Sequence, residues 1–288
     1  MGLTGVSSSG KSTLADLLKD ALIEFTDLNE GDATVLHLDN FYRPIQDVYE
    51  IQGLKPEDFI TKVNWDDPNL IDYERLILAI QELKNRGETV VKKYHKKTGT
   101  YKSGEMETVR ANRLIIVESF LLFSAGLSME GNYSSGKKKE PVLSNPAEVS
   151  QQILDLIQYR VFVDCNKSVA WLRRLGRDAH SVPRTFSETH ELWTRDAWPG
   201  AMKYIYPLRE LREDGGIFDR YIDNTVLSVT DIDYVFWDIV NTLEVSIKPE
   251  YANNFMKRQQ WIETRYKKGS VEEAKWLYSL FTSRNSTD

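Results

Sequence analysis

The chain has 288 residues, 41% of them hydrophobic and 28% charged, and its 37 basic and 43 acidic side chains give a net charge of −6. This length allows one large α/β domain with or without an appendage, and the acidic balance argues against nucleic acid as a partner, because phosphate backbones select basic faces. A single cysteine, Cys165, excludes a disulfide framework, and no apolar run approaches the ~20 residues of a membrane span. We therefore expect a cytoplasmic or nuclear protein that does not associate with a membrane.

The segment from Gly5 to Thr13, GVSSSGKST, has the G-x4-G-K-[ST] spacing of a P-loop. Glycines and small serines let backbone N–H groups approach a triphosphate closely, and the helix that follows adds N–H groups and a favourable dipole. Lys11 is predicted to reach the β- and γ-phosphates, and the Ser12 hydroxyl to ligate Mg²⁺. The predicted ATP-binding loop comprises Gly5, Val6, Ser7, Ser8, Ser9, Gly10, Lys11, Ser12 and Thr13.

Only four residues precede Gly5, although a P-loop normally follows a strand of about five or six residues. We therefore expect a first strand that is either clipped or unusually short. Apolar residues at helical spacing predict a helix within residues 14–25. A buried strand is predicted at residues 34–38, ending at Asp39, and residues 44–64 are expected to be irregular.

The next predicted helix begins at Asp67, a capping residue followed by Pro68, and ends at Gly87. Residues 88–110 have strand-like composition around a turn at 98–99 and predict a β-hairpin. The lysines of this hairpin are expected to form a solvated face.

Strands alternate with helices in the remaining pattern, which predicts a parallel sheet covered by helices on both faces. Further strands are expected at 114–117, 159–164 and 220–225, and helices at 168–179 and 231–245. The aromatic tail is expected to pack on its own domain, with a dimer surface as the alternative. The predicted organisation is an α/β P-loop domain at 1–245 with a hairpin insertion at 88–110, a mobile loop at 124–145 and a lid at 173–186, followed by a helical extension at 246–288.

Two predicted strands end in a carboxylate, Asp39 and Glu118. In an open parallel sheet these ends lie at the same edge as the P-loop, where ligands bind. One carboxylate there can accept the proton of an attacking hydroxyl while another holds Mg²⁺ or its waters. The alternative is that both residues only cap turns or helices.

Three arginines, Arg173, Arg174 and Arg177, follow at helical spacing. Phosphoryl transfer needs positive charge over the γ-phosphate, and arginines on a closing lid supply it. A solvated helix face is the alternative. The N-K-x-D string typical of a GTPase does not occur, so the combined pattern favours a kinase.

The segments GVSSSGKST, HLDNFYRP, NWDDP, IIVESFLLF, RRLGR, AWPGAMKY and YIDNT occur in the order found in nicotinamide riboside kinases. Over about residues 2 to 245 the chain resembles this family, which belongs to the uridine-kinase-like group of P-loop small-molecule kinases. The resemblance implies a five-stranded parallel sheet, helices on both faces and a closing lid. It also implies transfer of the γ-phosphate of ATP, with Mg²⁺, to the 5′-hydroxyl of a nicotinamide riboside, by a monomer or homodimer.

The resemblance assigns roles residue by residue. Asp39 matches the proton acceptor, Asp66 with Arg174 matches the pair that grips the ribose hydroxyls, and Tyr42 and Trp65 match aromatic positions that sandwich the base. The implied catalytic residues are Lys11, Asp39, Glu118 and Arg177, and the implied metal-binding residues are Ser12, Asp39 and Glu118. Beyond the P-loop, the implied ATP contacts are Arg173, Arg177, Thr225 and Val226. The implied substrate-binding residues are Asp39, Asn40, Phe41, Tyr42, Trp65, Asp66, Arg174 and His180.

Some positions depart from the family pattern. Asn40 stands where the family often has a second acid, and Ala179 precedes His180 where a lid aromatic is expected. The long hairpin resembles the base-reading hairpin of uridine kinases and could bring Tyr94 or His95 over the base. The alternatives are therefore a uridine/cytidine kinase of the same fold, or a nucleotide-binding switch without small-molecule turnover.

Overall fold

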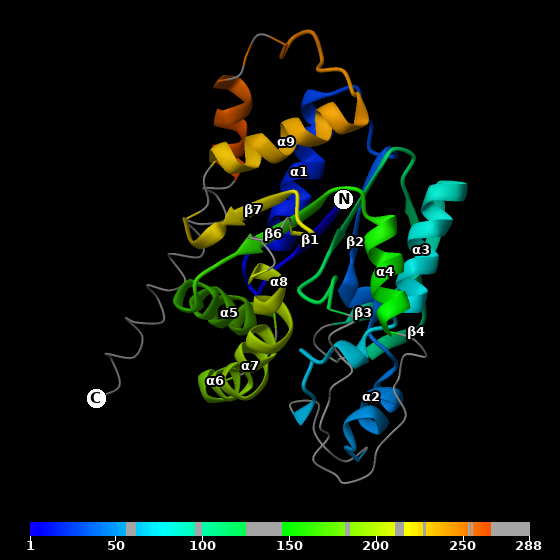
Figure 1. Ribbon diagram of the computed structural model, residues 1–288, viewed down its shortest axis with the longest axis vertical. Coiled ribbons are helices and arrows are strands. Elements are labelled where there is room, and N and C mark those ends of the chain that lie inside the picture. The colour runs from blue at the N-terminus through cyan, green and yellow to red at the C-terminus, as the bar shows by residue number, and fades with distance from the viewer. Residues whose placement is uncertain are drawn as a thin grey trace.

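The computed structural model describes residues 1–55, 62–95, 100–124, 146–181, 185–210, 216–226, 229–252, 254 and 256–265. The predicted fold class is confirmed, because a five-stranded parallel sheet in the order β2-β5-β1-β6-β7 carries helices on both faces (Figure 1). Its strands are β1 (Gly2–Thr4), β2 (Ala33–His37), β5 (Leu114–Glu118), β6 (Arg160–Asp164) and β7 (Arg220–Asp223).

The register of the sheet brings the functional turns to one edge. In β1, which is short as expected, Leu3 is the partner of Glu118 in β5 and of Val161 in β6. His37, the last residue of β2, is also in register with Glu118. The P-loop, the turn after β2 and the end of β5 therefore meet at the carboxyl ends of neighbouring strands, where open parallel sheets bind ligands.

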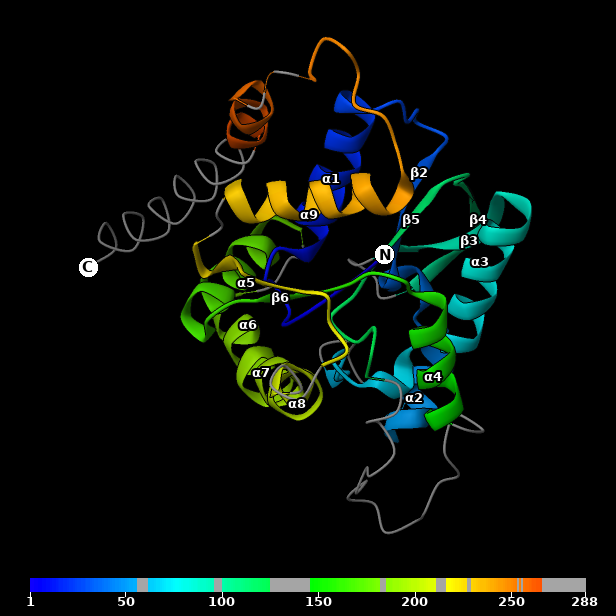
Figure 2. The same cartoon turned by 45° about the horizontal axis from the view of Figure 1, so that its top comes forward.

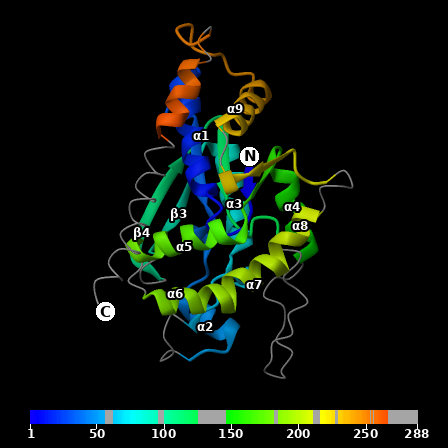
Figure 3. The same cartoon turned by 90° about the vertical axis from the view of Figure 1, so that its left-hand side faces the viewer.

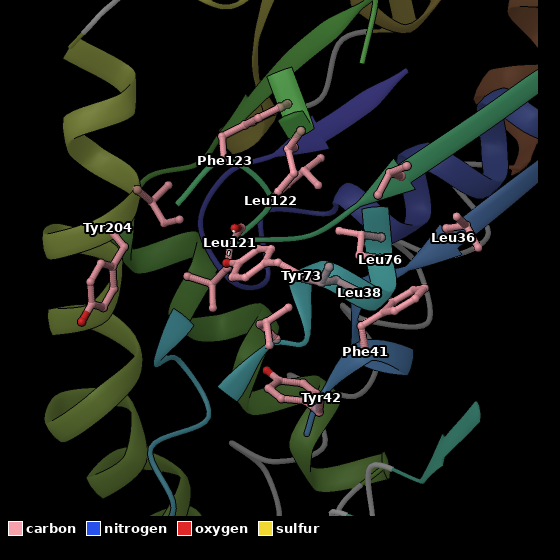
Figure 4. Close-up of a cluster of buried hydrophobic side chains, with 14 of the residues drawn as sticks. Leu36, Leu38, Phe41, Tyr42, Tyr73, Leu76, Leu121, Leu122, Phe123 and Tyr204 are labelled. Carbon is pink, nitrogen blue, oxygen red and sulfur yellow. Dashed lines mark hydrogen bonds between the residues drawn. The ribbon is translucent and has the colours of Figure 1, made fainter. Parts of the chain in front are cut away.

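Two apolar layers hold the helices on the sheet. Side chains alternate along β5, so Ile116 packs with α1 (Lys11–Phe25) and α9 (Val229–Leu243), whereas Val117 packs with α3 (Tyr73–Arg86) and α4 (Pro146–Leu156). Figure 2 shows these pairs of helices on opposite sides of the sheet. In the second layer, Tyr73 donates a hydrogen bond to the Leu121 carbonyl at 2.8 Å, beside Leu36 and Leu76 (Figure 4).

The structure corrects two predicted boundaries. Residues 44–64 are not irregular throughout, because α2 (Ile45–Gln52) forms there and ends at a left-handed Gly53. Asp67 does not begin the long helix; it caps the 3-10 helix η3 (Pro68–Leu70), and Asp72 caps α3. Two capping residues stand close together, and the sequence pattern could not tell which one preceded the long helix. Helix α4 begins directly after the predicted mobile loop, most of which lies outside the described residues.

The predicted hairpin forms from β3 (Glu88–His95) and β4 (Thr100–Arg110), outside the main sheet. Arg75 of α3 anchors it by donating to the Val90 carbonyl at 2.6 Å and to the Thr89 hydroxyl at 3.3 Å. At its far end, the backbone N–H of Tyr94 donates to the Asn40 side chain at 3.4 Å. The hairpin is thus tied to the turn that carries Asp39.

After α5 (Lys167–Ser181), α6 (Phe186–Leu192), α7 (Trp198–Gly200) and α8 (Tyr206–Glu210) form one helical run (Figure 3). Two π-helical segments lie in this run, η5 (Trp193–Ala197) and η6 (Ala201–Ile205). Pro199 explains the first one. Its ring would collide with the carbonyl four residues earlier in an α-helix, and the wider π turn removes that collision.

The described part of the tail packs on α1 and α9. Lys248 donates to the carbonyls of Ile23 and Glu24, where α1 ends. Arg258 forms a buried ion pair with Asp233 of α9 at 2.6 Å, and Trp261 meets Phe25 edge to face at 5.3 Å. Among the described helices, none combines the length and apolar character needed to cross a membrane.

Candidate functional site: a P-loop facing a buried carboxylate

The P-loop is built as an anion cradle. Gly5 has a φ of +144°, and a Cβ there would overlap the Val163 carbonyl oxygen, so only glycine fits. No side chain caps the first turn of α1, which leaves its N–H groups available to a ligand. The hydroxyls of Ser8 and Ser9 are buried and have no hydrogen-bond partner in the described part of the chain. These features fit a bound polyphosphate.

Lys11 is the charged group around which the predicted site residues gather. It is 6% exposed, and its ammonium group donates to the Val6 carbonyl at 2.8 Å. Burial lowers the pKa of Lys11 to about 8, while the neighbouring Glu118 charge opposes this shift. Asp39 and Asp66 also act electrostatically on the ammonium group. Carboxylates from three separate segments therefore act on the charge of one lysine, and the charge of Arg177 opposes them.

Glu118 lies beside the P-loop at the end of β5. Its Oε1 atom accepts hydrogen bonds from the Ser12 hydroxyl at 2.9 Å and from His37 Nδ1 at 2.8 Å. Burial alone would raise the pKa of Glu118, but the His37 bond and the Lys11 charge outweigh burial and lower it. Glu118 is therefore ionised at neutral pH. His37 was not identified by sequence reasoning, because it lies inside the predicted strand 34–38, whereas the observed β2 ends at His37.

Ser12, Asp39 and Glu118 fit a site for Mg²⁺ that is shared with a nucleotide. The described residues contain no cluster of three or more His, Cys, Asp or Glu side chains able to hold a metal alone. Mg²⁺ bound with a nucleotide needs only one or two protein oxygens, because phosphates and waters complete its shell. The hydroxyl and carboxylate oxygens present are the ligands this ion prefers.

The turn after β2 is the 3-10 helix η1 (Leu38–Phe41), which contains three of the predicted substrate residues. Asp39 is half-buried and faces Lys11. Asn40 holds the hairpin through Tyr94. Phe41 is 2% exposed and packs in the core, where its carbonyl accepts from the Asp72 N–H at 2.7 Å. Phe41, which was predicted to bind substrate, is therefore a core residue that supports the turn.

Asp66 is the most unusual group in the site. It is 6% exposed, and no described residue donates a hydrogen bond to its carboxylate or forms an ion pair with it. Burial raises the pKa of Asp66, and the charge of Arg174 partly opposes this shift. A buried, unpaired carboxylate is costly, and hydroxyl donors from a ligand would remove that cost.

Aromatic rings from three segments lie near Asp66. Tyr42 and Trp65 meet edge to face with centroids 5.2 Å apart, and the Tyr42 hydroxyl donates to the Trp65 carbonyl at 2.8 Å. These rings touch each other, so they do not form the expected sandwich around a base. Tyr94 of the hairpin lies 5.2 Å from Tyr42 and 6.2 Å from Trp65. The alternative prediction for the hairpin thus matches the position of Tyr94, whereas His95 is bonded to Glu105 at 2.6 Å.

The lid arginines divide into two groups. Arg174 donates to the Ser7 hydroxyl of the P-loop at 3.1 Å, and both Arg174 and Arg177 donate to Asp178 at 3.1 Å. Asp178, which is 1% exposed, was missed by sequence reasoning because it reads as an ordinary helix-surface acid. Arg173 points the other way and donates to the Asn224 carbonyl at 2.9 Å.

The segment after β7, η7 (Asn224–Val226), lies beside the P-loop. Asn224, another residue that sequence reasoning missed, donates from its side chain to the Ser9 carbonyl in the P-loop. Thr225 accepts from the Asn166 N–H at 2.9 Å. The side chains of Val226 and His180 lie outside the described residues. The predicted ATP residues Arg173 and Thr225 are thus joined to the P-loop through Asn224.

The helical run that contains the two π-helical segments lies against Asp66. A Cβ on Gly200 would lie 3.1 Å from the Asp66 Cβ. Asp196 lies four residues earlier, so it occupies the same helix face; it is 7% exposed and bonded to Arg195. Its negative charge also acts on Asp66. Nothing in the sequence pattern singled out either residue.

Comparisons with known proteins agree with this geometry at the level of family and fold. Residues 1–126 match the Phosphoribulokinase / Uridine kinase family. A uridine kinase of Ligilactobacillus salivarius is 25% identical over 81% of this chain and 92% of its own length, and one of Chlamydia pneumoniae is 25% identical over 80% and 85%. A proposed fructose transport system kinase from Silicibacter sp. TM1040 shares the fold, with a TM-score of 0.52, 16% identity and coverage of 76% and 87%. These similarities are to kinases of the uridine kinase type, and they do not support a nicotinamide riboside kinase in particular.

Proposed function

We propose that this chain is an ATP-dependent kinase that phosphorylates the 5′-hydroxyl of a ribonucleoside, with uridine or cytidine as the first candidate substrates. The observation that carries the proposal is that carboxylates from three segments, Asp39, Asp66 and Glu118, act electrostatically on the P-loop lysine, Lys11, while Ser12 of the same loop donates to Glu118 at 2.9 Å. A phosphate cradle beside a proton acceptor and a diol acceptor is what phosphoryl transfer to a sugar hydroxyl requires. The names of the relatives favour a pyrimidine nucleoside within this class.

Each residue has one task in this proposal. The P-loop N–H groups and Lys11 bind the triphosphate, and Asp39 accepts the proton of the attacking hydroxyl. Asp66 accepts hydrogen bonds from the vicinal ribose hydroxyls, while Arg174 reaches from the lid to the P-loop. When bound at Ser12 and Glu118, Mg²⁺ supplies positive charge that neutralises the phosphates. Burial of the site keeps bulk water from competing with the acceptor hydroxyl.

Nicotinamide riboside is the second candidate. Its ring is a flat cation, and cations prefer aromatic faces. Trp65 and Tyr94 supply rings, and the negative charges of Asp66 and Asp196 lie close enough to interact with each other. The direct contact between Tyr42 and Trp65 is the reason for placing this substrate second.

The test is ADP release with ATP, Mg²⁺ and single ribosides, followed by competition between uridine and nicotinamide riboside at equal concentration. ADP formed only with a riboside supports the kinase, and a higher kcat/KM for uridine supports the first candidate. A higher kcat/KM for nicotinamide riboside would reverse the order of the candidates. Tight ATP binding without turnover of any riboside would contradict the proposal and support a switch.

A further inference from the structure

Two hydrogen-bond donors converge on a single oxygen of Glu118. Ser12 donates to Oε1 at 2.9 Å and His37 Nδ1 lies 2.8 Å from the same atom. Since Glu118 is ionised, its oxygens can only accept, so Nδ1 carries the proton of this bond. Neither bond uses Oε2, which therefore keeps its lone pairs for another partner.

The sheet register explains why the imidazole reaches Glu118. His37 and Glu118 are paired residues at the ends of the neighbouring parallel strands β2 and β5. Paired residues of a sheet project on the same face, so the register itself brings the two side chains together. A slip of one residue would turn His37 to the opposite face.

We propose that His37 is a positioning residue that fixes the Glu118 carboxylate so that Oε2 faces the metal accompanying the nucleotide. This inference rests on the proposed kinase function. Side chains that hydrogen-bond a metal ligand fix its orientation, and removing one typically costs about 10- to 100-fold in metal affinity. A purely structural role is a poor explanation, because 38% of the His37 side chain is exposed.

The experiment measures Mn²⁺ binding by electron paramagnetic resonance in the presence of a non-hydrolysable ATP analogue, using full-length protein and no riboside. We expect His37→Ala to weaken Mn²⁺ binding about tenfold or more. His37→Asn should retain most of the affinity, because its side-chain amide can donate from nearly the position of Nδ1. Affinity for the analogue in EDTA should stay unchanged in both variants.

His190→Ala is the matched control. His190 lies in α6 against Phe186 and Trp171, on a different element from the metal-binding residues, and its removal should leave Mn²⁺ affinity unchanged. Mn²⁺ affinity of His37→Ala equal to that of the wild-type protein, with both folded by circular dichroism, would overturn the inference. An equal loss in His37→Ala and His37→Asn would overturn the donor role. Failure of the wild-type protein to bind Mn²⁺ with the analogue would instead contradict the proposed function on which the inference rests.

Discussion

Around the P-loop, the hydroxyls of Ser8 and Ser9, beside the uncapped start of α1, and the Oδ1 atom of Asn224 are buried and have no partner in the described part of the chain. Where the phosphoryl acceptor is proposed to bind, the buried group without a hydrogen-bond partner among the described residues is the carboxylate of Asp66. The first region offers mainly donors, namely the two hydroxyls and the N–H groups of the uncapped helix start, and the second offers an acceptor. Because a buried polar group is costly until it is bonded, the difference predicts what each region binds: an anion at the loop and hydroxyl donors at Asp66.

The largest effect should come from the residue between the two regions. Asp39→Asn removes the proton acceptor but keeps the size of the side chain, so kcat should fall by about 10²- to 10⁴-fold. KM for ATP and for the riboside should change less than kcat, because the P-loop supplies most of the binding of ATP and Asp66 accepts from the ribose hydroxyls. Steady-state kinetics with both substrates measure the split. A wild-type kcat in this variant would place the base elsewhere.

Asp66→Asn should weaken the binding of the riboside and leave the binding of ATP unchanged. A hydrogen bond to a charged acceptor contributes about 1.5–3 kcal/mol, so KM for the riboside should rise about 10- to 100-fold while KM for ATP stays constant. Removing a buried, unpaired charge should also raise Tm. Kinetics and thermal melting test both effects in one protein.

The neighbouring Asp67 provides a matched control. Asp67 accepts from the N–H and side chain of Asn69 at 2.9 Å and caps η3, so Asp67→Ala should lose about 1 kcal/mol of stability. The two adjacent acids should thus shift Tm in opposite directions. A fall in Tm for Asp66→Asn would mean that its carboxylate is structurally bonded, and the comparison would fail.

The pH dependence should sharpen the comparison further. Burial raises the pKa of Asp66 above its usual range, so kcat/KM for the riboside should fall several-fold as pH decreases through that raised value, because the protonated acid loses its charge as an acceptor. The contribution of Asp66 to stability has the opposite sign. Protonation relieves a buried charge, so this contribution is present at low pH and is lost as pH rises through the folded pKa.

Profiles from about pH 4.5 to 8 in wild type and Asp66→Asn measure both signs. The side-chain amide that replaces the carboxylate in Asp66→Asn cannot titrate, so this limb should be absent from the kcat/KM profile of the variant. A riboside profile that remains identical in the two proteins would assign the titration to another group.

The sequence predicted the phosphate region better than the acceptor region, for a physical reason. A P-loop is a local structure, because Gly5, Gly10 and Lys11 act through a single turn and the helix after it. Asp39 and Glu118 could be placed because strand ends in a parallel sheet share an edge. Contacts such as His37 with Glu118 and Asn224 with Ser9 depend on register between distant segments, which no local pattern encodes.

The acceptor region depends on long-range packing instead. Tyr42, Trp65 and Tyr94 come from three segments, and whether their rings touch or face each other across a gap is set by tertiary structure. The motif order predicted Trp65 and Asp66 as substrate-binding residues, but contact between the Tyr42 and Trp65 rings replaced the expected sandwich. Chain order likewise gave no sign that the π-helical run would press against Asp66.

The smallest predicted effect tests that last contact. An alanine at Gly200 would place its Cβ 3.1 Å from the Asp66 Cβ and 3.5 Å from the Asp66 carbonyl oxygen, so one side must shift. Gly200→Ala should raise KM for the riboside about three- to fivefold, equivalent to ~1 kcal/mol of overpacking, with KM for ATP unchanged. Tm should move little, because alanine favours a helix by about 0.5–1 kcal/mol over glycine and offsets the strain.

Gly31→Ala is the matched control, since nothing lies within 4 Å of its added Cβ, and it should leave both KM values unchanged. Equal riboside KM values in the two variants would show that the helical run yields at Gly200, and Asp66 would then be positioned by its own turn alone.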